Sequence, residues 1–148
     1  MICATTGADV TTNQVAFDAK SSSDMEIGVL DGHVAWKIVD RQHWNVGTYQ
    51  VEPNTTYWFK CAKEGNWVRC YVSTDGEKWT LDCELETNSL DNFTNVTFRI
   101  GTEETSGQYW RGTIDLGKSH INAHGNVYSL VEDVSCVVHF NSEGGSEV

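Results

Sequence analysis

The chain has 148 residues, enough for one domain that buries its own core. Hydrophobic residues make up 39% and charged residues 21%, an ordinary globular composition that excludes wholesale disorder. Acidic residues outnumber basic ones by 21 to 10, which gives a formal net charge of -11. Such a surface repels phosphate backbones, and no run approaches the roughly 20 apolar residues of a membrane span. We therefore expect neither a nucleic-acid partner nor membrane insertion.

The start of the chain and the cysteines indicate where the protein is made. The first residues, MICATT, have no basic start and no apolar run of signal-peptide length. The five cysteines are an odd number and include no Cys-x-x-Cys pair. These features predict a protein made in a reducing cytoplasm, with mostly buried cysteines that are reduced in the native state.

Short runs of strand character, separated by turn residues, recur from residue 14 to residue 140. No window has the apolar period of a helix. The predicted strands are 14–20, 25–30, 33–39, 48–51, 55–63, 67–73, 78–85, 96–101, 109–116, 119–123, 127–130 and 134–140. This pattern predicts an all-β, two-sheet antiparallel sandwich of the jelly-roll type over residues 14–140. We expect a flexible N-terminal arm at 1–13 and a flexible acidic tail at 141–148.

Two turn signals set the expected register of the strands between residues 55 and 85. Gly65-Asn66, read as a two-residue hairpin loop, places Cys61 opposite Cys70. Asp75-Gly76, read in the same way, places Val72 opposite Trp79. Alternation then predicts a core face that holds Tyr57, Phe59, Cys61, Val68, Cys70, Val72, Trp79, Leu81 and Cys83, with the three cysteines side by side. The opposite face holds Trp58, Lys60, Ala62, Trp67, Arg69 and Tyr71.

The chain is rich in aromatic residues, with six Trp and five Tyr. Flat aromatic side chains can stack on sugar rings, but they are also common in cores and at protein interfaces. The candidate glycan-binding or interface residues are Trp58, Trp67 and Tyr71 on one sheet face, and Trp36 and Trp44 in the segment 33–45. Core packing is the alternative for each of them.

Candidates for catalysis and metal binding are weak. Sandwich-type β-glucanases carry Glu-x-Asp-x-x-Glu, and glycosidases need two carboxylates about 5–10 Å apart. The nearest match, Asp82-Cys83-Glu84-Leu85-Glu86, departs from that spacing, so we predict no enzymatic activity and no cofactor. His120 and His124 would lie about 13 Å apart along a strand, too far for one metal ion. Jelly-roll loops often bind calcium, so a structural calcium ion is the alternative at turn residues Asp31, Asp40, Asp75, Asp91 and Asn92.

One stretch resembles a known family. Residues 110–128, WRGTIDLGKSHINAHGNVY, resemble a Gly-x-Ile-Asp-Leu-x-x-x-x-Ile-x-x-x-Gly pattern of laminin-G-like (concanavalin A-like) jelly-roll domains in bacteriophage virion proteins. Residues 71–79, YVSTDGEKW, match the family's upstream hairpin, Tyr-x-Ser-x-Asp-Gly-x-x-Trp, and residues 98–101 resemble the strand between. Tyr128 stands where the family has Trp. The resemblance covers roughly residues 55–130, over half of the chain.

The residues of this stretch have a physical interpretation of their own. We expect Ile114, Leu116 and Ile121 to point into the sandwich and Asp115 to fix a turn. The resemblance implies a non-enzymatic tail, fibre or head-decoration protein, made in the host cytoplasm and carried in the virion. Its expected partners are other virion proteins, in an oligomer or a larger assembly tethered by residues 1–13, and a bacterial surface glycan. The alternative is a carbohydrate-binding module or glycoside hydrolase of a bacterial glycan-degrading system.

Overall fold

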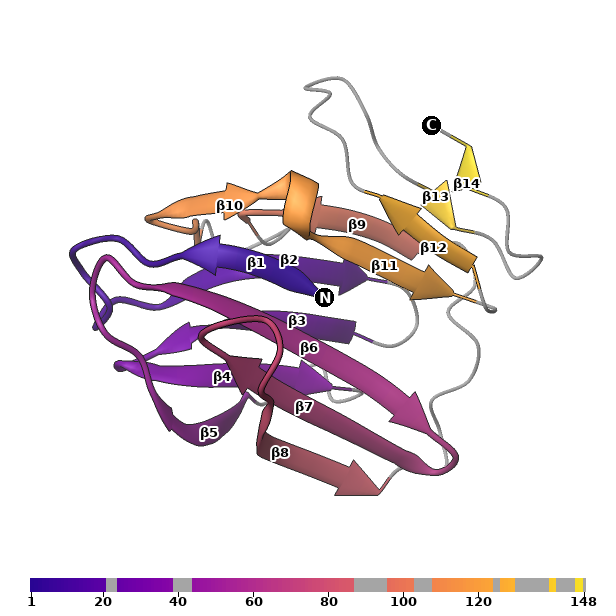
Figure 1. Cartoon of the computed structure of the whole chain (residues 1–148), viewed down its shortest axis with the longest axis horizontal. Helices are drawn as coiled ribbons and strands as arrows, with labels where there is room; N and C mark the ends of the chain where they lie inside the picture. Colours follow the sequence, from indigo (N-terminus) through magenta and orange to yellow (C-terminus); the bar gives the residue numbers. More distant parts are fainter. Residues whose placement is uncertain are drawn as a thin grey trace.

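A computed structural model of the chain describes residues 1–20, 24–38, 44–86, 96–102, 108–123, 126–129, 139–140 and 146–147. Most of these residues belong to two β-sheets that lie one in front of the other, with β6, β7 and β8 on the near side (Figure 1). The elements are β1 (Ile2–Thr5), β2 (Gln14–Lys20), β3 (Asp24–Leu30), β4 (His33–Ile38), β5 (Asn45–Gln50), β6 (Thr56–Glu64), β7 (Trp67–Ser73), β8 (Thr80–Glu86), β9 (Val96–Ile100), β10 (Thr113–Asp115), the 3₁₀ turn η1 (Leu116–Lys118), β11 (His120–Ala123), β12 (Asn126–Ser129), β13 (His139–Phe140) and β14 (Ser146–Glu147).

The strand order shows a sandwich. Within the described residues, the smaller sheet has the order β10-β1-β6-β7-β8 and the larger sheet the order β14-β13-β9-β2-β3-β4-β5. Strands β11 and β12 form a separate pair, and each pairing in these sheets is antiparallel. The prediction of an all-β, two-sheet antiparallel sandwich with a jelly-roll-like fold is therefore confirmed. Strands β2 and β7 have the predicted bounds.

Aromatic rings join the two sheets across the core. Trp36 of β4 and Phe59 of β6 are both 0% exposed, and their ring centroids are 6.3 Å apart in an edge-to-face arrangement. Phe59 also meets Trp110 at 6.4 Å, and Tyr49 of β5 meets Tyr57 of β6 at 6.0 Å. Edge-to-face contacts of this kind add about 0.5–1.5 kcal/mol to the burial of each ring.

The N-terminal segment is a central strand and not a flexible arm. Strand β1 pairs with β6 on one side and with β10 on the other. Ile2 and Ala4 are each 1% exposed and belong to the core. The prediction of a flexible arm at 1–13 is thus wrong for this strand, whereas the tether to a larger assembly stays a prediction. The short sequence of β1 carries little strand signal of its own. The strand is stabilised by pairing on both edges and by burial of Ile2, and neither of these is visible in the local sequence.

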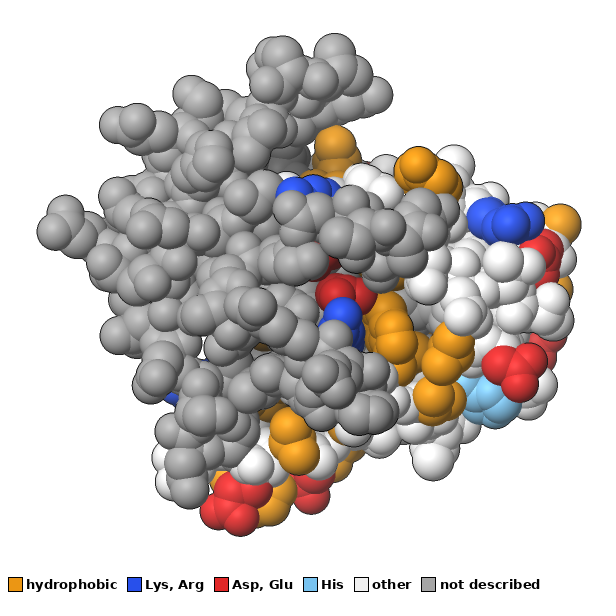
Figure 2. All heavy atoms as spheres, turned by 180° about the vertical axis from the view of Figure 1, so that it is seen from behind, with side chains coloured by type: hydrophobic (Ala, Val, Ile, Leu, Met, Phe, Trp, Pro, Cys, Tyr) orange, Lys and Arg blue, Asp and Glu red, His pale blue; other side chains and the backbone are white. Residues whose placement is uncertain are grey.

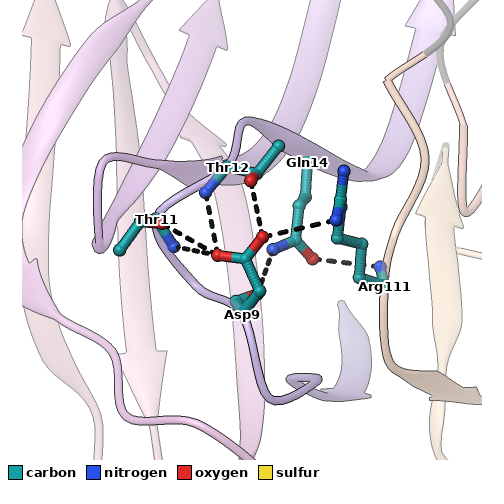
Figure 3. A network of polar contacts seen from close by, with 5 residues as sticks. All are labelled: Asp9, Thr11, Thr12, Gln14 and Arg111. Atoms are coloured by element: carbon teal, nitrogen blue, oxygen red, sulfur yellow. Dashed lines mark hydrogen bonds and ion pairs between the residues drawn. The ribbon is translucent and has the colours of Figure 1, made fainter.

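Polar contacts fasten the loop after β1 to the segment before β10 (Figure 3). The Asp9 carboxylate accepts hydrogen bonds from the backbone N–H groups of Thr11 (2.9 Å) and Thr12 (3.2 Å) and from both hydroxyls. It also pairs with Arg111 at 3.3 Å. The Gln14 amide donates to the Asp9 carbonyl (2.6 Å) and accepts from the Arg111 backbone N–H (3.0 Å). These donors, above all the Thr12 hydroxyl, hold the pKa of Asp9 well below its usual range.

Next to this network the backbone of Gly112 lies against that of Thr5. A Cβ atom at Gly112 would be 1.8 Å from the Thr5 carbonyl oxygen, a distance no side chain can adopt. We expect Gly112→Ala to force β10 away from β1 and to lower the free energy of unfolding by about 3 kcal/mol or more. Urea unfolding measures this effect. Gly117→Ala is the control, because its Cβ would come no closer than 3.4 Å to Asp115, and an equal effect in both variants would contradict the prediction.

The β6–β7 hairpin has the predicted register, but the register between β7 and β8 differs from the prediction. Cys61 pairs with Cys70 as expected, but Val72 pairs with Thr80 instead of Trp79. The loop is longer than two residues because side chains bind its backbone. Ser73 Oγ accepts from the N–H of Gly76 (2.9 Å), and Asp75 Oδ1 accepts from two further N–H groups, those of Glu77 and Lys78 (both 2.8 Å).

An irregularity in β8 then changes which side chains face the core. Cys70 pairs with Cys83, but Tyr71 pairs with Leu81, so Asp82 is an extra residue in β8. Leu81 is 46% exposed and lies with Tyr71 on the outer face. The prediction that Trp79 and Leu81 belong to the core is therefore wrong, whereas the prediction that the three cysteines lie side by side is confirmed.

The stretch that carries the family resemblance is partly a turn. Instead of one strand at 109–116, a short β10 is followed by η1, whose N-cap Asp115 accepts a hydrogen bond from the Lys118 N–H at 3.2 Å. The prediction that Asp115 fixes a turn is confirmed. Ile114, Leu116 and Ile121 pack against the core, also as predicted.

In the predicted tail, Ser146 and Glu147 pair with β13. Residues 141–145 and 148 of the tail lie outside the described residues, as do residues 134–138 of the last predicted strand.

Candidate functional site

The outer side of the smaller sheet gathers aromatic and basic side chains over β6, β7 and the start of β8. We call this surface the aromatic face, and it consists of Trp58, Lys60, Trp67, Arg69, Tyr71, Trp79 and Leu81. The sequence-predicted candidates Trp58, Trp67 and Tyr71 all lie on it. Trp67 is 36% exposed and the other two are half-buried. The structure thus brings these three together and adds Trp79, which sequence reasoning had placed in the core.

Lys60 organises the middle of the aromatic face. Its Nζ lies 4.7 Å from the centroid of the Tyr71 ring and 4.3 Å from that of the Trp79 ring. A cation at this distance from a ring face is attracted by the negative electron density of the ring. Because Tyr71 pairs directly with Lys60 across the strands, the contact follows from the register, while the long loop brings in Trp79.

Arg69 lies at the end of the aromatic face that is nearer the tip of the β6–β7 hairpin. Its guanidinium carbon lies 5.9 Å from the Trp67 ring centroid, and its Nε donates to Glu84 at 3.2 Å. A second carboxylate, Glu64, binds the Nη1 atom. The hydrogen bonds that Arg69 donates to Glu84 and Glu64 raise the pKa of Arg69, which therefore stays charged. This end of the face offers both carboxylate oxygens and guanidinium donors beside an indole ring.

Trp58 supports the loop between β7 and β8. A Cβ built on Gly76 would lie 3.2 Å from the Trp58 indole nitrogen, so this loop rests directly on the ring. Gly76 has a φ of +77°, which favours glycine at this position. The hydrogen bonds from the backbone N–H groups of Lys78 and Glu77 lower the pKa of Asp75, which keeps this carboxylate ionised. Trp58 thus positions the loop that carries Trp79.

The other two predicted tryptophans lie elsewhere. Trp36 is 0% exposed, and its indole N–H donates to Asp82 at 2.7 Å. It is a core residue, so its assignment as a glycan or interface contact is wrong. Trp44 is half-buried. Its ring lies close to Gly28 of the larger sheet, since a Cβ atom at that glycine would be 3.3 Å from the ring. Neither residue belongs to the aromatic face.

The Asp82 carboxylate joins the two sheets through hydrogen bonds. Its Oδ1 accepts hydrogen bonds from the backbone N–H groups of Thr48 and Tyr49, both at 2.8 Å, and its Oδ2 accepts from Trp36. The three donors belong to β4 and β5 of the larger sheet. Glu84, by contrast, faces outward to Arg69. The acidic run in β8 therefore divides between a contact to the other sheet and a surface ion pair.

A row of charges on the larger sheet was missed by sequence reasoning. Asp18 and Glu26 lie opposite each other on β2 and β3, at 1% and 4% exposure. Arg99 pairs with Asp18 at 3.2 Å and Lys37 with Glu26 at 2.7 Å. From behind, acidic and basic side chains lie side by side on this part of the molecule (Figure 2). Because a cation accompanies each carboxylate, the row favours ion pairing over general acid chemistry. In the sequence, the only indication of this row is that neighbouring strands carry charged residues at positions that pair with one another.

A polar cavity lies beside the Asp9 network at one end of the sandwich. It has a volume of about 440 Å³ and is lined by Thr11, Thr12, Asn13, Gln108, Tyr109 and Arg111. Tyr109 is 64% exposed. Hydroxyl, amide and guanidinium groups around one aromatic ring could bind a small polar ligand, so the cavity is the second candidate site.

Among the described residues, no group of three or more His, Cys, Asp and Glu side chains is placed to hold a metal ion. Asp31 and Asp75 both lie in turns, and His120 begins β11. Of the other candidates for calcium or metal binding, Asp40, Asp91, Asn92 and His124 lie outside the described residues.

The described residues contain no helix with the length and apolar character that crossing a membrane requires. Comparison of the chain with protein-family models, with curated proteins and with solved structures gave no match.

Proposed function

We propose that this chain is a non-enzymatic module of a bacteriophage virion, in the tail, a fibre or the head decoration, that contacts a bacterial surface glycan through the aromatic face. One observation carries the glycan contact. The rings of Trp67, Tyr71 and Trp79 share one sheet face with Lys60 and Arg69 and remain partly exposed.

The chemistry of this face suits a sugar chain. Indole and phenol rings pack against the apolar C–H faces of pyranose rings, as amphipathic aromatic side chains do in binding sites. Lys60 and Arg69 supply hydrogen-bond donors and Glu64 and Glu84 supply acceptors for hydroxyl groups. Since the face belongs to a β-sheet, it is extended and suits several consecutive sugar units better than one enclosed sugar.

The virion part of the proposal is supported by the resemblance of residues 71–79 and 110–128 to laminin-G-like domains of phage virion proteins. Partners would be other virion proteins. Antibody labelling of purified phage particles, viewed by electron microscopy, tests this part. Label on tails, fibres or heads is expected, and its absence from particles whose genome encodes the chain would overturn it.

For the glycan contact, we expect Tyr71→Ala and Trp79→Ala each to weaken binding to purified bacterial surface polysaccharides about tenfold or more. Both changes remove a stacking surface. Titration calorimetry against a panel of host polysaccharides measures the affinity. Tyr109→Ala is the matched control, because it removes an exposed aromatic ring that lines the polar cavity.

The outcomes separate the two candidate sites. Loss of binding in the first two variants alone supports the aromatic face. Loss only in Tyr109→Ala would move the site to the cavity and contradict the proposal. Absence of binding to every polysaccharide of the host panel would likewise overturn the glycan contact and leave assembly as the role.

The alternative is a carbohydrate-binding module of a bacterial glycan-degrading system, which would use the same aromatic face. The particle-labelling experiment distinguishes the two. A glycoside hydrolase is less well supported, since Asp82 is held by donors of the other sheet and Glu84 by Arg69. Release of reducing sugar by the purified chain would contradict the non-enzymatic assignment.

A further inference from the structure

Three cysteines lie in a row across neighbouring strands of the smaller sheet. Cys61 on β6 is opposite Cys70 on β7, and Cys70 is opposite Cys83 on β8. All three are free thiols, and the sulfur atoms of Cys61 and Cys70 are 2.8 Å apart. Cys70 is 0% exposed, while Cys61 and Cys83 are half-buried. The row thus has a sealed centre and two ends that are closer to solvent.

The register makes the two neighbouring pairs of this row different. Gly65, with a φ of +60°, opens a two-residue loop that is closed by Glu64 and Trp67. Such a closing pair exchanges both backbone hydrogen bonds, and hydrogen-bonded and non-hydrogen-bonded pairs then alternate outward. Counting three pairs outward makes Cys61 and Cys70 a non-hydrogen-bonded pair.

Side chains of non-hydrogen-bonded pairs are the closer ones, with Cα atoms about 4.5 Å apart, inside the range that a disulfide spans. The backbone groups of Cys70 then point towards β8, which makes Cys70 and Cys83 a hydrogen-bonded pair with Cα atoms about 5.5 Å apart. Geometry therefore favours bonding of Cys70 to Cys61 over bonding to Cys83.

We propose that Cys61 and Cys70 are a site of reversible cross-strand disulfide formation, with a low-molecular-weight disulfide such as oxidised glutathione as the oxidant. The thiol of Cys61 loses its proton and its sulfur attacks one sulfur of oxidised glutathione. The glutathione S–S bond breaks, a mixed disulfide forms on Cys61, and one glutathione leaves as a thiol after taking up a proton.

Cys70 completes the reaction. Its sulfur attacks the Cys61 sulfur of the mixed disulfide, the second glutathione leaves with the Cys70 proton, and the protein disulfide forms. In sum, two protein thiols are oxidised and one glutathione disulfide is reduced to two thiols. Contact with Cys61 and burial raise the pKa of Cys70, which fits a role as the second and not the first nucleophile.

The site does not rest on the proposed function. A reducing cytoplasm keeps the pair as thiols, and exposure to an oxidising exterior would close the bond between β6 and β7. The bond would tie the two strands that carry most of the aromatic face.

The test uses the full chain treated with oxidised glutathione at neutral pH and then denatured. We expect the count of free thiols to fall by two and the intact mass to fall by two hydrogen atoms. A peptide map should join the peptides of Cys61 and Cys70, and dithiothreitol should restore both thiols. Cys83→Ala should change none of this, whereas Cys61→Ala should abolish the loss of thiols.

Cys61→Ala alters a half-buried position, so it is expected to fold, and circular dichroism checks that it does. Cys70→Ala should stop at a glutathione adduct on Cys61. Three results would overturn the proposal: no loss of thiols, a stable glutathione adduct on the unsubstituted chain without ring closure, or a peptide map that joins Cys70 to Cys83.

Discussion

Deletion of residues 1–6 is expected to leave the chain unable to fold. Strand β1 lies between β6 and β10, so its loss removes two hydrogen-bond ladders and separates β10 from the rest of the smaller sheet. Burial of Ile2 alone contributes about 1.5–3 kcal/mol, and each net backbone hydrogen bond about 1 kcal/mol. Together these losses are comparable to the 5–15 kcal/mol of a typical domain. Near-UV circular dichroism and urea unfolding measure the result.

A point substitution tests the same strand without shortening the chain. Ala4 is 1% exposed, so Ala4→Asp would bury a carboxylate in an apolar position and should destabilise the fold by several kcal/mol. Thr5→Ser is the control, because it keeps the hydroxyl that contacts Thr56 at 2.8 Å. A cooperative unfolding transition in the deletion variant, at the urea concentration of the full chain, would show that β1 is dispensable.

Asp82→Ala is expected to lower the free energy of unfolding by about 2–4 kcal/mol. The change leaves the buried indole N–H of Trp36 and the backbone N–H of Tyr49 without the carboxylate that accepts their hydrogen bonds. An unsatisfied buried donor costs about 1–3 kcal/mol. The loss should also loosen β5 from β8, because Asp82 contacts the backbone of β5 at Thr48 and Tyr49.

Asp82→Asn keeps one acceptor oxygen and should cost less than the alanine variant. Glu86→Gln, at an exposed position of the same strand, is the control and should change stability by no more than about 0.5 kcal/mol. Urea unfolding and the emission spectrum of the tryptophans measure both effects. Equal stability of Asp82→Ala and Glu86→Gln would contradict the assignment of Asp82 as a contact between the sheets.

Local signals were enough for the fold class and for one hairpin. Period-2 alternation and the absence of helical periodicity predicted a two-sheet sandwich, and Gly65-Asn66 predicted the pairing of Cys61 with Cys70. They failed at Asp75-Gly76, because the turn there depends on hydrogen bonds that the side chains of Ser73 and Asp75 accept from backbone N–H groups. The dipeptide is compatible with either loop length, so composition alone could not choose.

The candidate site shows the same division. Trp58, Trp67 and Tyr71 were assigned to one face because their register depends only on the short hairpin loop. Trp79 was missed because the longer loop and the extra residue Asp82 place it on the outer face. Trp36 was misassigned, since a tryptophan between strand residues gives no indication of whether its indole N–H has a buried acceptor.

The sequence by itself determined the sandwich class, the β6–β7 register and the pairing of Cys61 with Cys70, because each follows from alternation along a strand or from a two-residue turn. The pairing of Cys70 with Cys83 depends on the longer loop and on the extra residue Asp82. Tertiary structure alone decided three other features. These are the central position of β1, the contact of Asp82 with the larger sheet, and the ion pair of Asp18 with Arg99. Each joins residues far apart in the chain, and the free energy of such contacts comes from burial and pairing that no local pattern encodes.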